Sequence, residues 1–246
     1  MPLPHSPKKL CIFGDSHIGC MKIALTEGIF TTRHALDFEF WGADGPRFRA
    51  LDLVGSTVVP RPEVLKTVLM VNGKGKEVLD PVEFDAILFM AARVRSQDLF
   101  TPLLHRMQQA DGFISNAVFR QICQDWLPRN RGYRTAKAMA ATKTANIFLA
   151  PTTFTTEGFE NQLSDKQRGA FSALPQDRDR IWQELTRIAA DDGITLIPQP
   201  EETVVNGCMT RKEYANTLTT GGIDPVHRNP KYAALLLGKV VDTFYS

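Results

Sequence analysis

The sequence predicts a three-layer α/β/α domain built around a five-stranded, mostly parallel sheet. Short, nearly continuous apolar runs alternate along the chain with longer amphipathic segments, which is the pattern of buried parallel strands joined by helices. Five runs have this character, and glycine or proline closes four of them: 10–13, 38–41, 84–90, 146–150 and 194–197. Helices that connect such strands are expected to cover both faces of the sheet.

The predicted helices lie between and after these strands. They span residues 17–27, 116–126, 132–144, 177–191 and 230–244. Ser115 is placed to N-cap the helix that follows it, because a serine hydroxyl can accept a hydrogen bond from a free backbone N–H in the first turn. In that helix Val118, Ile122 and Trp126 recur at four-residue steps, so we expect them to form its buried face.

Residues 53–80 interrupt the alternation and are predicted as an insertion before the third strand. Residues 67–71 and 76–79 flank the sequence Asn-Gly-Lys-Gly at 72–75, which suits a tight turn, so a β-hairpin is expected there. The chain has no internal repeat or low-complexity segment, and its Pro/Gly-rich patches are short. One domain over residues 1–246 is therefore expected.

The composition excludes several classes of protein. Of the 246 residues, 43% are apolar and 23% are charged, and 29 basic residues against 27 acidic ones give a net charge of +2. No basic block or long apolar run occurs, so neither nucleic acid nor a membrane is an expected partner. The four cysteines form no CxxC pair and have no zinc-type spacing, so we expect no disulfide scaffold, metal or cofactor. The N-terminus lacks the apolar segment of a signal peptide, which predicts a cytoplasmic location.

A candidate nucleophile follows the first strand. That strand ends in Gly14-Asp15-Ser16-His17, and a helix is predicted directly afterwards. Ligands of open parallel sheets bind beyond the carboxyl ends of the strands, so the Ser16 hydroxyl is expected to face a cleft. Its backbone N–H lies at a helix N-terminus, a position suited to stabilising an oxyanion. A serine needs a base to act as a nucleophile, and without one Ser16 is better explained as an N-cap.

A candidate base lies just before the last predicted helix, in Asp224-Pro225-Val226-His227. An aspartate three residues before a histidine in a tight turn can accept a hydrogen bond from the Nδ1–H of the ring. Nε2 is then free to take a proton from a serine. Alone, this motif also fits a surface turn with a solvated histidine. Its combination with Gly-Asp-Ser after the first strand is more specific.

With these two motifs on an alternating α/β chain, the sequence resembles the SGNH, or GDSL-like, hydrolase superfamily, in a variant with a GDSH first block and a DxxH last block. The resemblance spans the chain. It implies a flavodoxin-like fold and metal-free hydrolysis of esters or thioesters, or deacylation of carbohydrates. It implies Ser16 as the nucleophile, His227 as general base and then general acid, and Asp224 as the residue that orients His227. The histidine at position 17, where many relatives have leucine, resembles the subset associated with bacterial glycan acyl groups.

The resemblance also implies an oxyanion glycine after the second strand, in addition to the backbone N–H of Ser16. Gly42 and Gly45 are the candidates. Gly45 is favoured because the family's glycine directly precedes a helix, and Gly45 precedes the sequence Pro-Arg-Phe-Arg at 46–49. A plain turn glycine explains either position equally well.

The third strand departs from the family pattern. The family has Gly-x-Asn-Asp after this strand, and its Asn side chain donates to the oxyanion, whereas this chain reads Met-Ala-Ala-Arg-Val-Arg at 90–95. Loss of one oxyanion donor typically lowers turnover about 10²- to 10³-fold. Several explanations are open. Arg93 or another residue replaces the amide as a donor, or the enzyme is slow or uses different substrates. Alternatively, Arg93 and Arg95 serve to bind an anionic sugar or a phosphate, or both are solvated.

Other residues near the carboxyl edge of the sheet are candidates for substrate contact. The substrate-binding candidates are Asp15, His17 and Arg93. Trp41, at the end of the second strand, is a candidate for stacking on a sugar ring. Arg47 and Arg49 follow Gly45 and are candidates for the same cleft. Asn116 and Asn130 are further amide donors whose position the sequence leaves open.

These residues predict a serine-dependent hydrolase of carboxylesterase or acetylesterase type, acting on a small O-acyl group with a saccharide as a candidate alcohol. Two alternatives use the same scaffold. One is a glycan-binding or assembly protein that has lost efficient hydrolysis, for which the missing asparagine is the motive. The other is an O-acyltransferase that passes the acyl group to a sugar hydroxyl. The Gly-x-Ser-x-Gly elbow, the P-loop and His-Glu-x-x-His do not occur in the sequence.

Overall fold

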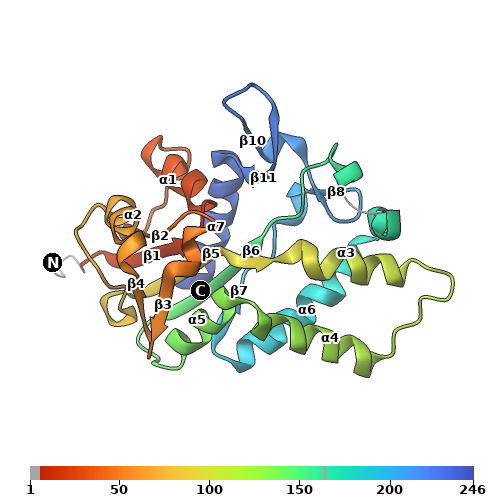
Figure 1. Cartoon of the computed structure of the whole chain (residues 1–246), viewed down its shortest axis with the longest axis horizontal. Coiled ribbons are helices and arrows are strands. Elements are labelled where there is room, and N and C mark those ends of the chain that lie inside the picture. Colours follow the sequence, from red (N-terminus) through yellow and green to blue (C-terminus); the bar gives the residue numbers. More distant parts are fainter. Residues whose placement is uncertain (1–5, 163–164) are drawn as a thin grey trace.

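A five-stranded parallel sheet forms the centre of the molecule (Figure 1). The computed structural model describes residues 6–162 and 165–246, so residues 1–5, which bear on the expectation about a signal peptide, lie outside it. The strands are β1 (Lys8–Gly14), β2 (Leu36–Gly42), β5 (Ala86–Arg95), β6 (Asn146–Thr152) and β7 (Ile194–Leu196). Their spatial order is β2-β1-β5-β6-β7, and every neighbouring pair is parallel. Numbered along the chain, this is the 2-1-3-4-5 order of flavodoxin-like folds, which confirms the predicted fold class.

Helices cover both faces of the sheet, so the fold has three layers. The helices are α1 (Ile18–Thr26), α2 (Pro62–Asn72), α3 (Ser96–Met107), α4 (Asn116–Arg129), α5 (Arg131–Ala140), α6 (Pro175–Asp191) and α7 (Pro230–Tyr245). Leu10 and Ile12 of β1 pack with α1 and α7 on one face. Cys11 and Phe13 belong to a larger apolar cluster on the other face, which includes side chains of α2 through α6. The nearly continuous apolar strands thus reflect burial of both sheet faces.

A β-hairpin precedes the third strand of the sheet, β5, but it lies earlier than predicted. Its antiparallel strands are β3 (Leu51–Val54) and β4 (Thr57–Pro60). The hairpin predicted over 67–79 is wrong, because residues 67–71 lie in helix α2. Val64 and Val68 bury one side of that helix at a four-residue step, and Gly73 ends it in the left-handed conformation at φ +60°. Helical periodicity and a glycine stop signal therefore outweigh the turn-like sequence at 72–75.

Helix α4 begins as predicted but buries a different face. The Ser115 hydroxyl accepts a hydrogen bond from the N–H of Val118 at 3.3 Å, which confirms the N-cap. The buried residues are Phe119, Cys123 and Leu127, and the predicted stripe of Val118, Ile122 and Trp126 is exposed or half-buried. Two apolar stripes lie side by side on this helix, one residue apart. Periodicity alone does not determine which of them packs against α5 and α6.

The carboxyl edge of the sheet gathers the remaining small elements. They are the hairpin of β8 (Val204–Val205) and β9 (Met209–Thr210) and the hairpin of β10 (Ala215–Thr217) and β11 (Ile223–Arg228). β1 and β5 are neighbours, but the chain leaves β1 toward β2 and returns to β5 on the other side. Such a reversal of direction opens a crevice at the carboxyl ends of two strands, where ligands of these folds bind. No helix within residues 6–162 and 165–246 is both long and apolar enough to cross a membrane.

Two glycines let the strand ends approach closely beside this crevice. A Cβ on Gly14 would lie 2.2 Å from the carbonyl oxygen of Met90, and a Cβ on Gly42 would lie 1.8 Å from that of Gly14. Gly42 also has φ +149°, which side-chain-bearing residues rarely adopt. The ends of β2, β1 and β5 are therefore held together by backbone contact, and residues 15–17 leave the sheet from a fixed point.

Candidate active site

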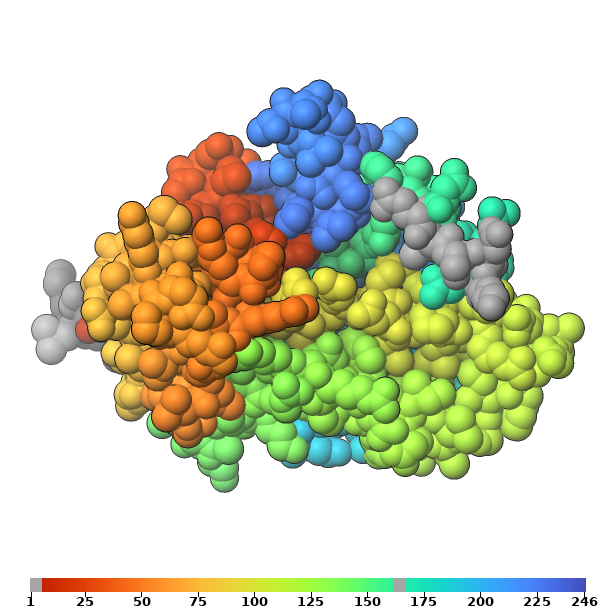
Figure 2. Space-filling view, in the orientation of Figure 1, coloured from red at the N-terminus to blue at the C-terminus, as the bar shows by residue number. Residues whose placement is uncertain are grey.

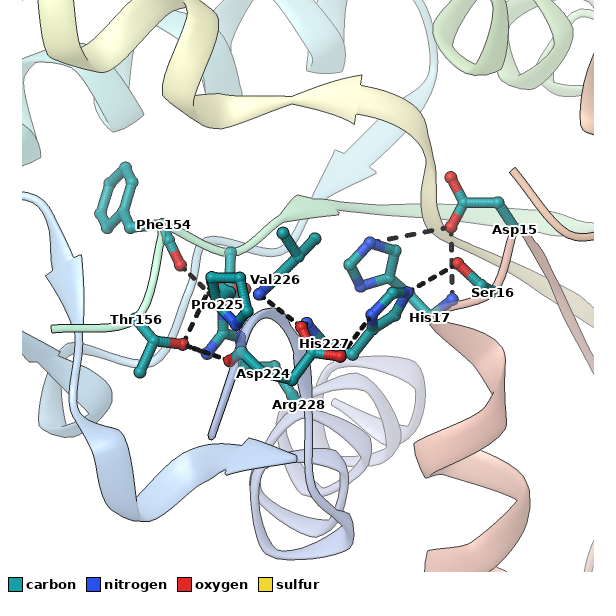
Figure 3. A network of polar contacts seen from close by, with 11 residues as sticks. Asp15, Ser16, His17, Phe154, Thr156, Asp224, Pro225, Val226, His227 and Arg228 are labelled. Carbon is teal, nitrogen blue, oxygen red and sulfur yellow. Dashed lines mark hydrogen bonds and ion pairs between the residues drawn. The ribbon is translucent and has the colours of Figure 1, made fainter. Parts of the chain in front are cut away.

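Three of the predicted site residues meet at the carboxyl edge of the sheet, although they lie at opposite ends of the sequence (Figure 3). The Oγ of Ser16 lies 2.8 Å from Nε2 of His227. The Nδ1 of that ring lies 3.0 Å from Oδ2 of Asp224. Ser16 comes from the turn after β1, and the other two residues come from β11. The arrangement has the hydrogen-bond pattern of a serine nucleophile, a base and an orienting carboxylate.

Ser16 is exposed and does not cap helix α1. The N-cap of that helix is His17, whose side chain makes no capping hydrogen bond. The Ser16 hydroxyl instead contacts the ring of His227, and its backbone carbonyl accepts a hydrogen bond from the N–H of Gly19 at 3.3 Å. The capping explanation of Ser16 is thus set aside. Its side chain faces solvent-accessible space, where a substrate can reach it.

Asp224 is held by two backbone amides as well as by the histidine ring. Its Oδ1 accepts hydrogen bonds from the N–H of Val226 at 2.8 Å and of His227 at 2.9 Å. Burial acts to raise the pKa of this carboxyl group, but the hydrogen bonds from these amides and from the ring outweigh burial and lower the pKa below its usual value. Asp224 therefore stays ionised near neutral pH, and its fixed geometry orients the ring of His227.

A buried arginine anchors the segment that carries Asp224 and His227. The guanidinium of Arg228 donates to the Thr153 hydroxyl at 2.6 Å, to the Thr156 hydroxyl at 2.5 Å, and to the carbonyls of Phe154 and Pro225 at 3.0 Å each. Burial lowers the pKa of Arg228 to about 10, so it is charged at neutral pH although all four acceptors are uncharged. These bonds tie β11 to the loop after β6 and fix the position of the His227 backbone.

His17 is buried against the ring of His227. The two ring centroids lie 4.8 Å apart at an angle of 32°, and the Nε2 of His17 lies 4.0 Å from Oδ1 of Asp15. Only 6% of His17 is exposed, and its Nδ1 has no hydrogen-bond partner in the described part of the chain. Burial lowers the pKa of His17 to about 4, with His227 and Arg228 adding to the effect and Asp15 opposing it. The ring beside the candidate base is therefore neutral.

Replacing His17 with glutamine is expected to flatten the dependence of stability on acid pH. Above the unfolded-state pKa of 6.5 the ring is neutral in both states and has no effect. Between that value and the folded-state pKa of about 4, the unfolded chain binds a proton that the folded chain does not, so the free energy of unfolding decreases as pH falls. The loss reaches about 3 kcal/mol near pH 4. Denaturant unfolding of both proteins at pH 7 and near pH 4 tests this, and parallel losses would contradict it.

Ser16 and His227 open into a cavity of about 340 Å³. Its walls come from residues 15–17 after β1, from the end of β5 and the start of α3, from the loop after β6, and from residues 225–227 of β11. In the space-filling view the red N-terminal, yellow central and blue C-terminal surfaces adjoin one another on this face (Figure 2). The volume is at the low end of ligand pockets, which fits a small substrate or one part of a larger one.

Strand β5 bulges where it meets this cavity. Met90 pairs with Ala150 and Arg95 pairs with Thr152, so four residues of β5 lie between these pairs where β6 has one. The additional residues leave the regular ladder at its carboxyl end. Bulges of this kind redirect side chains near sites, and this one delivers arginines to the cavity.

Three consecutive residues of the bulge have left-handed backbone conformations. They are Ala91, Ala92 and Arg93, at φ +58°, +46° and +63°. Each costs about 1 kcal/mol or more for a residue with a Cβ, so the surrounding structure must stabilise the bulge. Asp15 does so, because its Oδ2 accepts a hydrogen bond from the N–H of Arg93 at 3.3 Å. Gly132 of α5 also supports the bulge, because its lack of a side chain lets the helix backbone pack directly against it. A Cβ on Gly132 would lie 2.1 Å from the carbonyl oxygen of Ala92.

The backbone N–H groups of Ser16 and Gly45 are the candidate oxyanion donors. Neither the N–H of Ser16 nor that of Gly45 has a hydrogen-bond acceptor among the residues that the structure describes. A Cβ on Gly45 would lie 3.4 Å from Nη1 of Arg93, so Gly45 is next to an arginine of the cavity wall. Gly42, by contrast, is explained by its close contact with Gly14 in the sheet. The geometry thus leaves Gly45 as the better candidate donor.

Several other candidates lie away from the cavity. Trp41 is buried and its ring N–H donates to Glu39 at 2.9 Å, so the expectation that it stacks on a sugar is wrong. Arg47 pairs with Asp44 at 3.7 Å, and neither Arg47 nor Arg49 lines the cavity. Asn116 and Asn130 belong to the start and the end of α4, where they bond to Arg180 and to the carbonyl of Trp126. Neither amide replaces the missing third-block asparagine.

Sequence reasoning missed the residues that anchor β11, the strand that carries Asp224 and His227. Arg228 directly follows the DxxH motif, and the run Thr-Thr-Phe-Thr-Thr at 152–156 follows the strand β6. A polar run at the carboxyl end of a buried strand is a usable signal, because such residues lie where ligands bind. The side chains of Thr153 and Thr156 instead bind Arg228. Within residues 6–162 and 165–246 no group of three or more His, Cys, Asp and Glu side chains has the arrangement of a metal site.

Comparisons with known proteins find weak similarity. No protein-family model and no curated protein sequence matches the chain. A solved structure of a protein from Streptococcus pneumonia, provisionally assigned as a platelet activating factor, is 11% identical with a TM-score of 0.46, over 99% of this chain and 86% of that chain. The periplasmic domain of a lipopolysaccharide acetyltransferase from Salmonella ser. Paratyphi A is 10% identical with a TM-score of 0.43, over 98% of this chain and 85% of that chain.

Proposed function

We propose that this protein is a serine-dependent ester hydrolase of the SGNH type, which removes a small O-acyl group through an acyl-enzyme on Ser16. The observation on which the proposal rests is the hydrogen-bonded series from Ser16 through His227 to Asp224, at 2.8 and 3.0 Å. The series lies at the rim of a cavity at the carboxyl edge of a parallel sheet. An exposed serine with a positioned base, and with its own backbone N–H unbonded among the described residues, supports nucleophilic acyl chemistry.

The first half of the reaction acylates the serine. The Oγ of Ser16 attacks the acyl carbonyl carbon while Nε2 of His227 takes the hydroxyl proton. The ionised Asp224 stabilises the imidazolium that forms. The carbonyl oxygen becomes an oxyanion, which accepts hydrogen bonds from the N–H groups of Ser16 and Gly45. The bond to the alcohol oxygen then breaks, and Nε2 returns the proton to the departing alcohol.

The second half releases the acid. Water enters the position of the alcohol, gives a proton to Nε2 of His227, and attacks the acyl carbon of the ester on Ser16. Collapse of this intermediate breaks the bond to Oγ, which recovers its proton from the ring. The cavity of about 340 Å³ suits a short acyl group such as acetyl. A saccharide is the alcohol that we propose, on the resemblance of the GDSH block.

The cytoplasm is the location that we propose. All four cysteines are buried and none forms a disulfide. Burial raises the pKa of Cys20 and of Cys123 to about 12, so these thiols are protonated and unreactive. Reduced thiols are typical of that compartment. The same values remove both cysteines as competing nucleophiles, although Cys20 is only four residues from Ser16.

An acylation assay tests the proposal. We expect 4-nitrophenyl acetate to release nitrophenolate in a burst of about one equivalent per chain, followed by slower turnover. Mass spectrometry of the quenched protein is expected to find one acetyl group on the peptide that contains Ser16. Acetylation of another residue, or release without any acyl-enzyme, would refute the mechanism. Partition of the acyl group to an added sugar in preference to water would assign the same intermediate to acyl transfer.

A further inference from the structure

We infer that the substrate carries a negatively charged group, which Arg93 and Arg95 bind in the cavity beside Ser16. The inference rests on the proposed function, because it names the class of ester that this site accepts. Both arginines line the same cavity as Ser16 and His227. A planar guanidinium binds the oxygen atoms of a carboxylate, sulfate or phosphate with paired, charge-assisted hydrogen bonds.

The guanidinium groups of both arginines are unpaired. Neither makes a hydrogen bond or an ion pair with any residue in the described part of the chain. Arg93 is half-buried. Every other buried or half-buried arginine in the described ranges has a hydrogen-bond partner for its guanidinium. The buried Arg178 and Arg228 and the half-buried Arg131 all have several acceptors. The usual partners of a shielded guanidinium are thus missing at this one place, which the cavity leaves open to a ligand.

The other charged groups of the cavity do not neutralise these arginines. The carboxylate of Asp15 accepts hydrogen bonds from the backbone N–H groups of His17 and Arg93, both at 3.3 Å. Asp98 lies in the first turn of α3 and forms no ion pair within 4.0 Å with either guanidinium. His17 and His227 are the remaining titratable groups in the wall. A ligand anion therefore meets two arginines that no carboxylate within residues 6–162 and 165–246 occupies.

The backbone is built to present these side chains at some cost. The bulge of β5 holds three consecutive residues in the left-handed conformation, and Arg93 is the last of them. Asp15, the neighbour of the nucleophile, fixes the N–H of Arg93 at 3.3 Å and so ties the bulge to the turn that carries Ser16. The absence of a side chain at Gly45 leaves space beside Nη1 of Arg93. Strained segments that persist beside a catalytic group are usually retained for function.

Matched pairs of esters test this inference. Mono-4-nitrophenyl succinate against 4-nitrophenyl butyrate places the charge on the acyl side, and 4-acetoxybenzoate against phenyl acetate places it on the alcohol side. We expect wild type to prefer the charged member of at least one pair by about 10- to 100-fold in kcat/KM, mainly through a lower KM. The double variant Arg93→Gln, Arg95→Gln is expected to lose that preference, because its kcat/KM falls more for the charged ester than for the neutral one.

A control variant separates binding of the charged ester by Arg93 and Arg95 from an effect of the protein's net charge. Arg33→Gln removes one positive charge at an exposed arginine outside the cavity, so it should leave the preference intact. No preference in either pair, or a preference that survives the double variant, would overturn the inference. So would an Arg93→Gln variant whose kcat falls equally for neutral and charged esters at unchanged KM. In that case Arg93 would be a donor to the oxyanion and not a ligand of the substrate's charge.

A binding experiment tests the anion site independently of hydrolysis. Titration calorimetry of succinate and of 4-hydroxybenzoate into the Ser16→Ala variant measures binding without turnover. We expect at least one of these anions to bind, and its affinity to fall about tenfold or more when Arg93 and Arg95 are also glutamine. An inactive wild type with this binding would refute the hydrolase and keep the anion site. Binding of neither anion, or binding that the arginines do not affect, would reject the site.

Discussion

Replacing Ser16 with alanine is expected to lower turnover of 4-nitrophenyl acetate by about 10⁶-fold, to the level that binding and the oxyanion donors alone support. The physical reason is that Oγ is the atom that would form the acyl bond, and it lies 2.8 Å from its base. Alanine offers no nucleophile, and water would have to attack the substrate without prior acylation. Steady-state kinetics with active-site titration of the wild type gives the measurement.

The fold of the Ser16→Ala variant is expected to be unchanged. The hydroxyl is exposed and its bond to His227 is the only one it makes among the described residues, so its removal leaves no buried group unsatisfied. Ser115→Ala is the matched control, since Ser115 caps α4 away from the cavity. That variant should lose about 1 kcal/mol of stability and keep full turnover. Ser16→Ala activity within tenfold of wild type would refute the nucleophile.

The sheet could be predicted from sequence because burial on both faces leaves a strong local signal. Each predicted strand, from residues 10–13 to 194–197, overlaps an observed strand, and the order 2-1-3-4-5 agrees with the predicted fold. The errors occur where two local patterns compete. Residues 67–71 combine β-branched residues with a nearby turn signal, yet Val64 and Val68 pack at a helical step. On α4, two adjacent apolar stripes are equivalent in sequence, and only tertiary packing chooses between them.

The candidate site was predictable in part, for a similar reason. Ser16, Asp224 and His227 stand in short motifs with fixed local spacing, so their chemistry can be read from the sequence. Arg228 is different, because its meaning depends on acceptors that lie more than 70 positions earlier in the chain, at Thr153 and Thr156. No local pattern records such a contact.

The bulge at the end of β5 has no local signal either. Its left-handed residues include two alanines, which have no intrinsic preference for that conformation. Local rules predict a regular continuation of the strand, and the structure departs from them beside the turn that carries Ser16. Departures of this kind tend to occur at functional positions, where tertiary contacts such as that of Asp15 with the N–H of Arg93 compensate for them.

Replacing Asp224 with asparagine is expected to lower kcat/KM about 10⁴-fold while keeping the shape of the site. Asparagine has only one accepting oxygen. The backbone N–H groups of Val226 and His227 compete for it with the ring Nδ1–H, and in the wild type both amides already bond to Oδ1, at 2.8 and 2.9 Å. If the oxygen keeps those bonds, the amide NH₂ lies where Oδ2 was, 3.0 Å from Nδ1 of His227. An NH₂ group only donates, so Nδ1 must become the acceptor and the ring proton moves to Nε2. The ring would then donate to Ser16 and no longer accept its proton.

The opposite amide orientation does not rescue the variant. It would face the NH₂ group toward two backbone N–H donors, leave both without an acceptor, and cost more than the altered tautomer. Asp98→Asn is the matched control, because it removes a carboxylate from the same cavity without touching His227. We expect that control to stay within a few-fold of wild type. Nitrogen-15 chemical shifts of the His227 ring report the tautomer directly. An Asp224→Asn variant with the wild-type tautomer and more than a tenth of the wild-type kcat/KM would show that Asp224 does not orient the base.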